Sequence, residues 1–244
     1  MSSPSQDLQK FAAILQDTYT RLDWYKLGSE YCFEGGENFF SDEALEAIQD
    51  AGLHIASDMG EKLARFESKD SLYVGPGVAE LVMMLFETLV LGRRVTAVTL
   101  PGIEPDEVNR IWTGLAKEHK TTLPKFQTRA LRIAEEPTCS HLWFGSVVTD
   151  PESFPALHDR LYKRQDTREA IGGGNLTKET RRAEELVGTA MTWMLVPSVI
   201  TTSQEELVFF QQMIESRGLS LNVPTQGRLS PIVGDSLFHC DLHS

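Results

Sequence analysis

The chain has 244 residues, a length that suits one large domain or one domain with a modest cap. Hydrophobic residues make up 41% and charged residues 24%, a balance typical of a globular chain, which excludes disorder as the main state. With 35 acidic and 23 basic residues the formal net charge is -12, so the surface as a whole repels nucleic-acid phosphates and anionic lipid. We therefore expect neither a nucleic acid nor a membrane as a partner.

Signals for export and for metal binding are both missing from the sequence. The first residues lack the basic and apolar regions of a secretion signal, and no stretch is long and apolar enough for a membrane span. Cys32, Cys139 and Cys240 lie far apart and form no CxxC pair, which favours a reducing interior over a disulfide framework. The six histidines show no HExxH spacing. His239 falls in the last expected strand and His243 directly after it, and alternation along that strand puts His239 and Cys240 on opposite faces. We expect a cytoplasmic chain without a metal site.

The N-terminal region has a helical pattern. Apolar residues such as Leu8, Phe11 and Leu15 recur at helical spacing, and similar spacing continues through much of residues 7–66. An aromatic-rich stretch with two glycines interrupts the pattern. We expect a helical N-terminal cap over residues 1–69.

Short apolar runs alternate with helical segments over residues 70–244. Strands are expected at 71–74, 94–100, 125–133, 141–148, 189–200, 219–223 and 236–242, and helices at 78–91, 104–119, 153–163, 178–187 and 201–217. Because helices join successive strands, the pattern predicts right-handed β-α-β units. The last two strands have no helix between them and should pair antiparallel near an edge. The predicted fold is α/β: a Rossmann-like, mostly parallel seven-stranded sheet with an antiparallel C-terminal strand pair.

A glycine turn marks the point where the first strand of this region becomes a helix. Gly75 and Gly77 flank Pro76 there, so the backbone can approach a ligand closely and the helix N-terminus can offer N–H groups to it. A dinucleotide fingerprint would need glycine where Glu80 stands, a negative charge beside a pyrophosphate. The sequence therefore disfavours NAD and FAD, and the absence of GxxxxGK[ST] excludes a P-loop.

The order of strand, glycine turn, alternating units and terminal antiparallel pair, over about residues 70–242, resembles the class I S-adenosylmethionine-dependent methyltransferases. The resemblance implies S-adenosylmethionine as the cofactor, with its methionine part at the glycine turn. The residues it assigns to the cofactor are Gly75, Pro76, Gly77, Glu80, Thr99, Leu100, Glu104, Glu135, Phe144, Gly145 and Ser146.

Those residues come from the ends of four strands. The family's ribose-binding acid follows the second strand, where this chain has Thr99 and Leu100, so Glu104 is the nearest acid. The acid near the adenine would be Glu135 or Glu136. The resemblance is not complete, because Tyr73 and Ala79 stand where the family's first motif often has an acid and a third glycine.

Further residues are expected on the acceptor side. Phe144, Gly145 and Ser146 end the fourth strand, where the family places methyl transfer, and Asp150 follows as the candidate catalytic residue that orients or deprotonates a nucleophile. In the family, the segment before the first strand often folds over the cofactor. This assigns Tyr25, Tyr31 and Phe39 as lid or substrate residues, although aromatic side chains more often serve packing.

The sequence thus predicts a methyltransferase for a small-molecule acceptor, with a protein acceptor as the less favoured alternative. Methyl transfer is an in-line displacement that needs alignment and exclusion of water rather than a universal catalytic residue. The fourth strand lacks the [DN]PP[YF] pattern of amino-methylating nucleic-acid enzymes. Two alternatives stay open: transfer of the aminocarboxypropyl group of the same cofactor, and a methyltransferase-like scaffold without catalysis, which the missing acid after the second strand favours.

Overall fold

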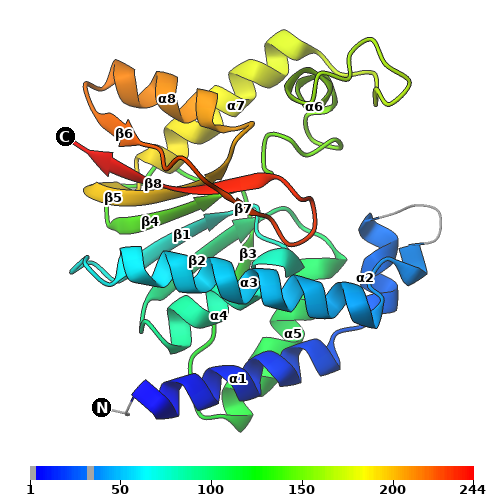
Figure 1. The fold of residues 1–244 in the computed structure, drawn as a ribbon, viewed down its shortest axis with the longest axis vertical. Coiled ribbons are helices and arrows are strands. Elements are labelled where there is room, and N and C mark those ends of the chain that lie inside the picture. The colour runs from blue at the N-terminus through cyan, green and yellow to red at the C-terminus, as the bar shows by residue number, and fades with distance from the viewer. Residues whose placement is uncertain (1–3, 32–35) are drawn as a thin grey trace. The chain divides into compact units, whose positions relative to one another are not determined.

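The computed structural model describes residues 4–31 and 36–244. Its contacts group them into two compact units. The first unit contains the described residues up to Ser71 together with Pro76–Ala130 and Ser230–Gly234, and the second contains Leu72–Gly75, Leu131–Leu229 and Asp235–Ser244. Figure 1 gives the course of the chain and the labels used below.

The strands follow the order β3-β2-β1-β4-β5-β8-β6, with β7 beside β8. Their bounds are β1 Asp70–Val74, β2 Arg94–Thr99, β3 Phe126–Thr128, β4 Cys139–Phe144, β5 Met194–Ser203, β6 Ser220–Asn222, β7 Arg228–Leu229 and β8 Ser236–His243. The β2–β3 and β4–β5 pairs are parallel, whereas β8 is antiparallel to β5, β6 and β7. The expected mostly parallel sheet with an antiparallel C-terminal pair is confirmed. The two-residue β7 makes eight strands in the described residues instead of seven.

The first unit combines β2 and β3 with the N-terminal helices. The helices and 3₁₀ turns of this unit are α1 Pro4–Arg21, α2 Trp24–Tyr31, η1 Gly36–Asn38, α3 Asp42–Leu63, η2 Val78–Glu80, α4 Leu81–Leu89 and α5 Ile103–Glu118, where η marks a 3₁₀ turn. Helix α4 carries an almost wholly apolar sequence because α1 and α3 both pack against it, and α1 also packs on α5. The helical character of the N-terminal region is confirmed. The division into a 1–69 cap and a 70–244 domain stays a prediction.

A buried ion pair fastens the loop after α4. Arg93 Nε donates to Glu87 Oε2 at 3.0 Å, and both side chains are fully buried. The remaining Arg93 nitrogens donate to the carbonyl oxygens of Ser68 and Asp70, at the start of β1. The pairing with Arg93 explains how the buried helix α4 tolerates the carboxylate of Glu87.

The second unit places three helices on one side of its strands. They are α6 Pro155–Leu161, α7 Leu176–Met191 and α8 Leu207–Ser216, and Figure 1 shows them together beside β4, β5 and β8. Within the sheet, Tyr73 stacks on Trp143 with ring centroids 5.5 Å apart. His141 Nε2 lies 2.9 Å from Thr201 Oγ1, which lies 2.8 Å from His239 Nδ1. His141 of β4 and His239 of β8 therefore belong to a buried polar network.

Several predicted boundaries were wrong, among them the end of the strand expected at 141–148, which lies at Phe144. The strand expected at 189–200 begins only at Met194, since helix α7 continues to Met191. Val187, Ala190 and Met191 are buried in that helix, and an apolar buried helix end has the same hydrophobic pattern as a strand. The helix expected at 201–217 begins at Leu207, since residues 201–203 pair with β8. The strand expected at 125–133 covers only β3.

Candidate functional site

The glycine turn after β1 needs both of its glycines, for different reasons. Gly75 has φ +64°, a left-handed conformation that glycine adopts without strain. Gly77 is required by space: a Cβ there would lie 2.9 Å from Glu104 Oε1 and 3.1 Å from the Tyr31 hydroxyl oxygen. A side chain at position 77 would therefore have to displace the Glu104 carboxylate and the Tyr31 hydroxyl.

Two backbone N–H groups of this turn donate to carboxylates of the first unit. Gly77 N donates to Glu80 Oε2 at 2.8 Å, the reciprocal half of a capping arrangement at the start of η2. Val78 N donates to Glu104 Oε1, which also accepts the Tyr31 hydroxyl at 2.7 Å. The N–H groups that the sequence assigns to a ligand are thus held by internal acceptors.

Glu104 and Tyr31 form a buried donor–acceptor pair. Burial raises the pKa of Glu104, while the hydrogen bonds from Tyr31 and Val78 N favour its charged form and oppose the rise. Burial and, next, the charge of Glu104 raise the pKa of Tyr31 well above its usual value. Tyr31 therefore stays a hydroxyl donor, and the Glu104 oxygens are the acceptors at this turn.

Helix α2 and turn η1 hold Tyr31 in place. A Cβ on Gly28 would lie 2.0 Å from the Gly36 carbonyl oxygen, so the two backbones pack directly against each other. Tyr31 stacks on Phe39 with centroids 5.4 Å apart and an interplanar angle of 18°. Of the three predicted lid residues, Tyr31 lies at the glycine turn with Phe39 beside it. Tyr25 is 70% exposed.

A second tyrosine lies near Glu80. Only 7% of Tyr19 is exposed. Its buried hydroxyl makes no hydrogen bond within the described residues. Burial, followed by the charge of Glu80, raises the pKa of Tyr19. The first unit thus brings Glu80 and Glu104 of the prediction to the turn and adds Tyr19, which the sequence reasoning had not singled out.

The end of β2 carries no acid, as its sequence indicated. Thr99 is half-buried and Leu100 is 66% exposed. Glu104 follows in the first turn of α5 and reaches the Val78 N–H from there. The Glu104 carboxylate therefore reaches the glycine turn from the helix that follows β2.

In the second unit, Glu206 organises the loop after β4. Its carboxylate accepts the backbone N–H groups of Ser146, Val147 and Val148 at 3.1, 2.6 and 2.8 Å. Ser203 Oγ donates to it as well, at 3.1 Å. These bonds shape a loop in which Ser146 has φ +59°, an uncommon conformation for a residue with a side chain. Sequence reasoning missed Glu206, which lies within the segment expected as a helix over residues 201–217.

The Glu206 carboxyl is a titrating group in the neutral range. Complete burial raises its pKa to about 7, against the opposing effect of the hydrogen bonds from Val148 and Val147. Its protonation state is therefore tied to the loop that contains the predicted residues Gly145 and Ser146. Phe144, at the end of β4, is buried.

Asp150 has a structural use in the same loop. Its two carboxylate oxygens accept the N–H groups of Glu152 and Ser153, each at 3.2 Å. The Asp150 carbonyl oxygen accepts Phe154 N at 2.9 Å. Asp150 therefore holds the turn that leads into α6.

Further polar side chains lie where β4 and β5 end and β8 begins. Tyr162 donates to Asp235 Oδ2 at 2.5 Å, and burial together with this bond raises the pKa of Tyr162. Burial also raises the pKa of Glu205, and the charge of Asp235 adds to the rise. No local pattern indicates this cluster in the sequence, because its members are far apart in the chain.

His158 stands beside this cluster in a defined tautomer. Its Nδ1 lies 2.6 Å from the Thr149 carbonyl oxygen, and its Nε2 lies 3.3 Å from an Arg164 nitrogen. Because arginine can only donate, Nε2 accepts and Nδ1 carries the proton. The imidazole packs against Tyr162 with ring centroids 4.7 Å apart.

Glu135 and Glu136 lie elsewhere. Both are exposed, and the segment that carries them bonds to the residues before β5, with Ala134 N donating to Thr192 Oγ1 at 2.9 Å. Because β4 and β5 are parallel, this segment lies at their amino ends, opposite to the loop of Asp150. The structure therefore does not bring these two acids to the loop after β4.

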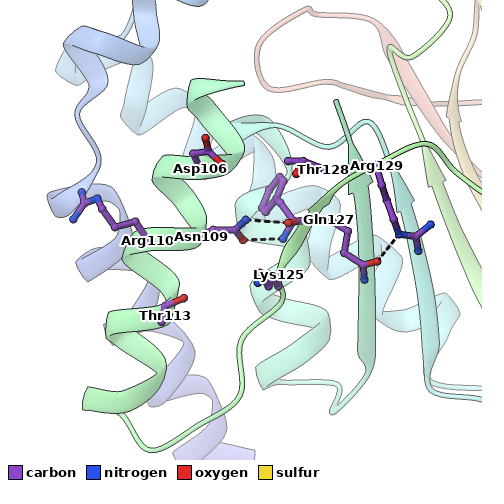
Figure 2. Close-up of a pocket in the computed structure, with 9 residues that line it drawn as sticks. Asp106, Asn109, Arg110, Thr113, Lys125, Gln127, Thr128 and Arg129 are labelled. Atoms are coloured by element: carbon purple, nitrogen blue, oxygen red, sulfur yellow. Dashed lines mark hydrogen bonds between the residues drawn. The ribbon is translucent and has the colours of Figure 1, made fainter. Parts of the chain in front are cut away.

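A groove of about 980 Å³ lies between α5 and β3 in the first unit, and Figure 2 shows its lining. The lining residues are Asp106, Asn109, Arg110, Thr113, Lys125, Phe126, Gln127, Thr128 and Arg129. The Asn109 amide donates to the Phe126 carbonyl oxygen and accepts the Phe126 N–H, both at 2.9 Å. Asn109 thereby occupies the outer edge of β3 in the manner of a neighbouring strand.

Membrane spans and metal clusters are both missing from the described part of the chain. Among the helices of residues 4–31 and 36–244, none combines the length and the apolar character that crossing a membrane requires. In the same residues, histidine, cysteine and acidic side chains form no group of three or more that could hold a metal ion.

Comparison with known proteins gives likeness in structure alone. No family model and no curated protein matches the chain. The O-methyltransferase from Bacillus cereus, solved in complex with SAH, is 9% identical over 93% of this chain and 100% of its own, with a TM-score of 0.45. The precorrin-6y C5,15-methyltransferase from Geobacter metallireducens is 12% identical over 78% of this chain and 88% of its own, also with a TM-score of 0.45.

A third solved protein, PH0851, is 12% identical with a TM-score of 0.49. The match covers 82% of this chain but 46% of PH0851, so the chain spans about half the length of that protein. At such identities these comparisons concern the fold, and the functional argument rests on the residues of the glycine turn.

Proposed function

We propose that the chain is an S-adenosylmethionine-dependent methyltransferase acting on a small-molecule acceptor. The observation that carries the proposal is the carboxylate of Glu104 at the glycine turn, where it accepts two donors beside a residue that has no room for a side chain. A buried carboxylate with this environment suits the hydroxyl groups of a ribose. The place of the turn after β1 in a mostly parallel sheet supports the same function.

The charges at the turn favour a cofactor without phosphate. Glu80 and Glu104 both lie at the amino end of the helix that follows the turn, where a dinucleotide would place its pyrophosphate. S-adenosylmethionine has no phosphate and carries a sulfonium and an ammonium group, which acidic side chains stabilise. The cofactor would supply an electrophilic methyl group, and the chain would bind, orient and exclude water.

For the acceptor side we propose the loop after β4. Asp150 uses both carboxylate oxygens within its own turn, so its proposed role is to keep this loop in shape rather than to remove a proton. Glu206 has the same role from the other side of the loop. The net charge of -12 supports a small acceptor over a nucleic acid.

Isothermal titration with S-adenosylhomocysteine, S-adenosylmethionine and NAD tests the cofactor. We expect micromolar binding, about -8 kcal/mol, for the first two and no heat for NAD. The variant Gly77→Leu should abolish binding, because its side chain would displace Glu104 and Tyr31. Gly114→Leu, on α5 where a Cβ comes no closer than 3.9 Å to Glu118, is the matched control and should bind normally.

Two results would contradict the proposal. Full binding by Gly77→Leu would show that the cofactor lies elsewhere. No heat and no thermal shift with either adenosyl compound would indicate a scaffold with a methyltransferase-like fold. Where binding is found, the mass of the product distinguishes methyl transfer from aminocarboxypropyl transfer.

A further inference from the structure

The Tyr31 hydroxyl lies at the glycine turn and is bonded to the Glu104 carboxylate. It lies 2.7 Å from Glu104 Oε1, and a Cβ on Gly77 would lie 3.1 Å from it. Tyr31 thus lies directly against Gly77, where any side chain would collide with it. Glu104 Oε1 also accepts Val78 N, so this single oxygen joins the turn, α5 and α2.

We propose that Tyr31 is an internal competitor for the cofactor and thereby sets its affinity. In the ligand-free chain the phenol holds the Glu104 carboxylate, and cofactor binding exchanges this hydroxyl for one of the ribose. The inference rests on the proposed function, because it concerns the same site. In this inference Tyr31 opposes cofactor binding, whereas from the sequence we expected it to be a lid or substrate residue.

The exchange replaces one hydroxyl donor to Glu104 with another. Tyr31 donates one O–H to a buried carboxylate, and a ribose hydroxyl would donate one O–H to the same oxygen, so little free energy is gained at this contact. The apparent affinity is then reduced by the fraction of molecules in which Tyr31 has left Glu104. A variant that cannot make the internal bond would avoid this loss.

The packing around Tyr31 allows a variant that changes this bond alone. The ring stacks on Phe39 and meets Phe40 edge to face at 5.2 Å, contacts that do not involve the hydroxyl. Phenylalanine at position 31 would keep both. Tyr25 lies on the same helix with 70% of its surface exposed, so Tyr25→Phe removes the same atom from a position away from the turn.

The test is titration of S-adenosylhomocysteine into the full chain and the variants Tyr31→Phe and Tyr25→Phe. Tyr31→Phe should bind about tenfold more tightly, the scale of one lost hydrogen bond to a charged group. Tyr25→Phe should match the wild type. Circular dichroism of Tyr31→Phe checks that the helices are retained.

Each other outcome overturns the inference. Weaker binding by Tyr31→Phe would make Tyr31 a residue that contacts the ligand, and unchanged binding would make it a packing residue. In both cases the wild type still binds and the proposed function stands. Absence of binding in the wild type and in both variants, with S-adenosylmethionine as well, would remove the proposed function and the competition together.

Discussion

In each of the loops that follow β1 and β4, one carboxylate accepts more than one donor. In the first unit Glu104 accepts one backbone N–H and one phenol at the turn after β1. In the second unit Glu206 accepts three consecutive N–H groups of the loop after β4. A carboxylate can satisfy several donors at once, which makes it suited to fix irregular backbone that no strand partner supports.

The titration of Glu206 predicts a pH-dependent stability. The pKa of Glu206 is about 7 in the folded chain against 4.5 as the ordinary value, so the folded state holds its proton more tightly than the unfolded state. The contribution of this proton to the free energy of unfolding is complete below about pH 4.5 and is lost as the pH rises through about 7. At 1.36 kcal/mol per pKa unit this is about 3 kcal/mol.

The substitution Glu206→Gln removes this titration. The stability of the variant relative to the wild type should therefore increase by up to about 3 kcal/mol between about pH 4.5 and pH 8. Urea unfolding at several pH values in that range measures it, with Glu215→Gln, exposed on the same helix, as the control. A constant difference in stability between the Glu206→Gln variant and the wild type at all pH values would contradict the expectation.

At this scale the sequence could suggest Glu104 but not Glu206. Glu104 was found because it is the first acid after a strand whose end the pattern located. Glu206 follows Thr202 and Ser203, a combination that resembles a helix cap, and its backbone donors lie about sixty residues away in the chain. The Tyr162–Asp235 bond is missed for the same reason, since partners brought together by tertiary structure leave no local pattern.

Among the elements, the loop between α4 and β2 depends on an ion pair. Glu87 and Arg93 are fully buried, and Ser71 Oγ accepts Arg93 Nε at 2.8 Å as well. Removing one partner of such a pair leaves a buried charge without compensation, a loss of about 3–5 kcal/mol. The adjacent Arg94 pairs with Asp70 but has a side chain that is 77% exposed, which makes this second pair worth about 1 kcal/mol or less.

Arg93→Met and Arg94→Met therefore form a matched test. Arg93→Met should lower the free energy of unfolding by several kcal/mol, and Arg94→Met by less than about 1 kcal/mol. Denaturant unfolding of the two variants measures the difference. Equal losses would mean that the buried pair is not the contact that fastens this loop.

The elements were predicted most reliably where burial differs between faces or strands are uniformly apolar. Strand β4 is buried throughout and begins close to its predicted start, although it ends at Phe144 instead of residue 148. The α7–β5 boundary failed because apolar residues such as Met191, Trp193 and Leu195 continue from the helix end into the strand, so hydrophobicity alone gives no break. The strand end at Thr201–Ser203 failed because hydroxyl side chains satisfy either a cap or a buried strand pairing.

For the molecule as a whole, the order of strands could be anticipated but the grouping of helices could not. The absence of a helix before the last strand was enough to predict the antiparallel β8 beside β6. The contacts of α1 and α3 with α4 are long-range and left no trace in the pattern beyond the apolar sequence of α4 itself. Neither compact unit is one continuous segment, since the chain passes between them at residues 71, 75, 130, 229 and 234.

This arrangement predicts that residues 70–244 do not fold alone. In the first unit α4 has Leu81, Met83 and Leu85 fully buried, and α1 and α3 are helices that pack on it. A fragment without residues 1–69 would expose this apolar surface, at about 25 cal/mol for each Å². We expect it to aggregate or to lack a cooperative thermal transition, as measured by circular dichroism and gel filtration beside the full chain. A monomeric fragment that melts cooperatively near the melting temperature of the full chain would instead establish residues 1–69 as a separable cap.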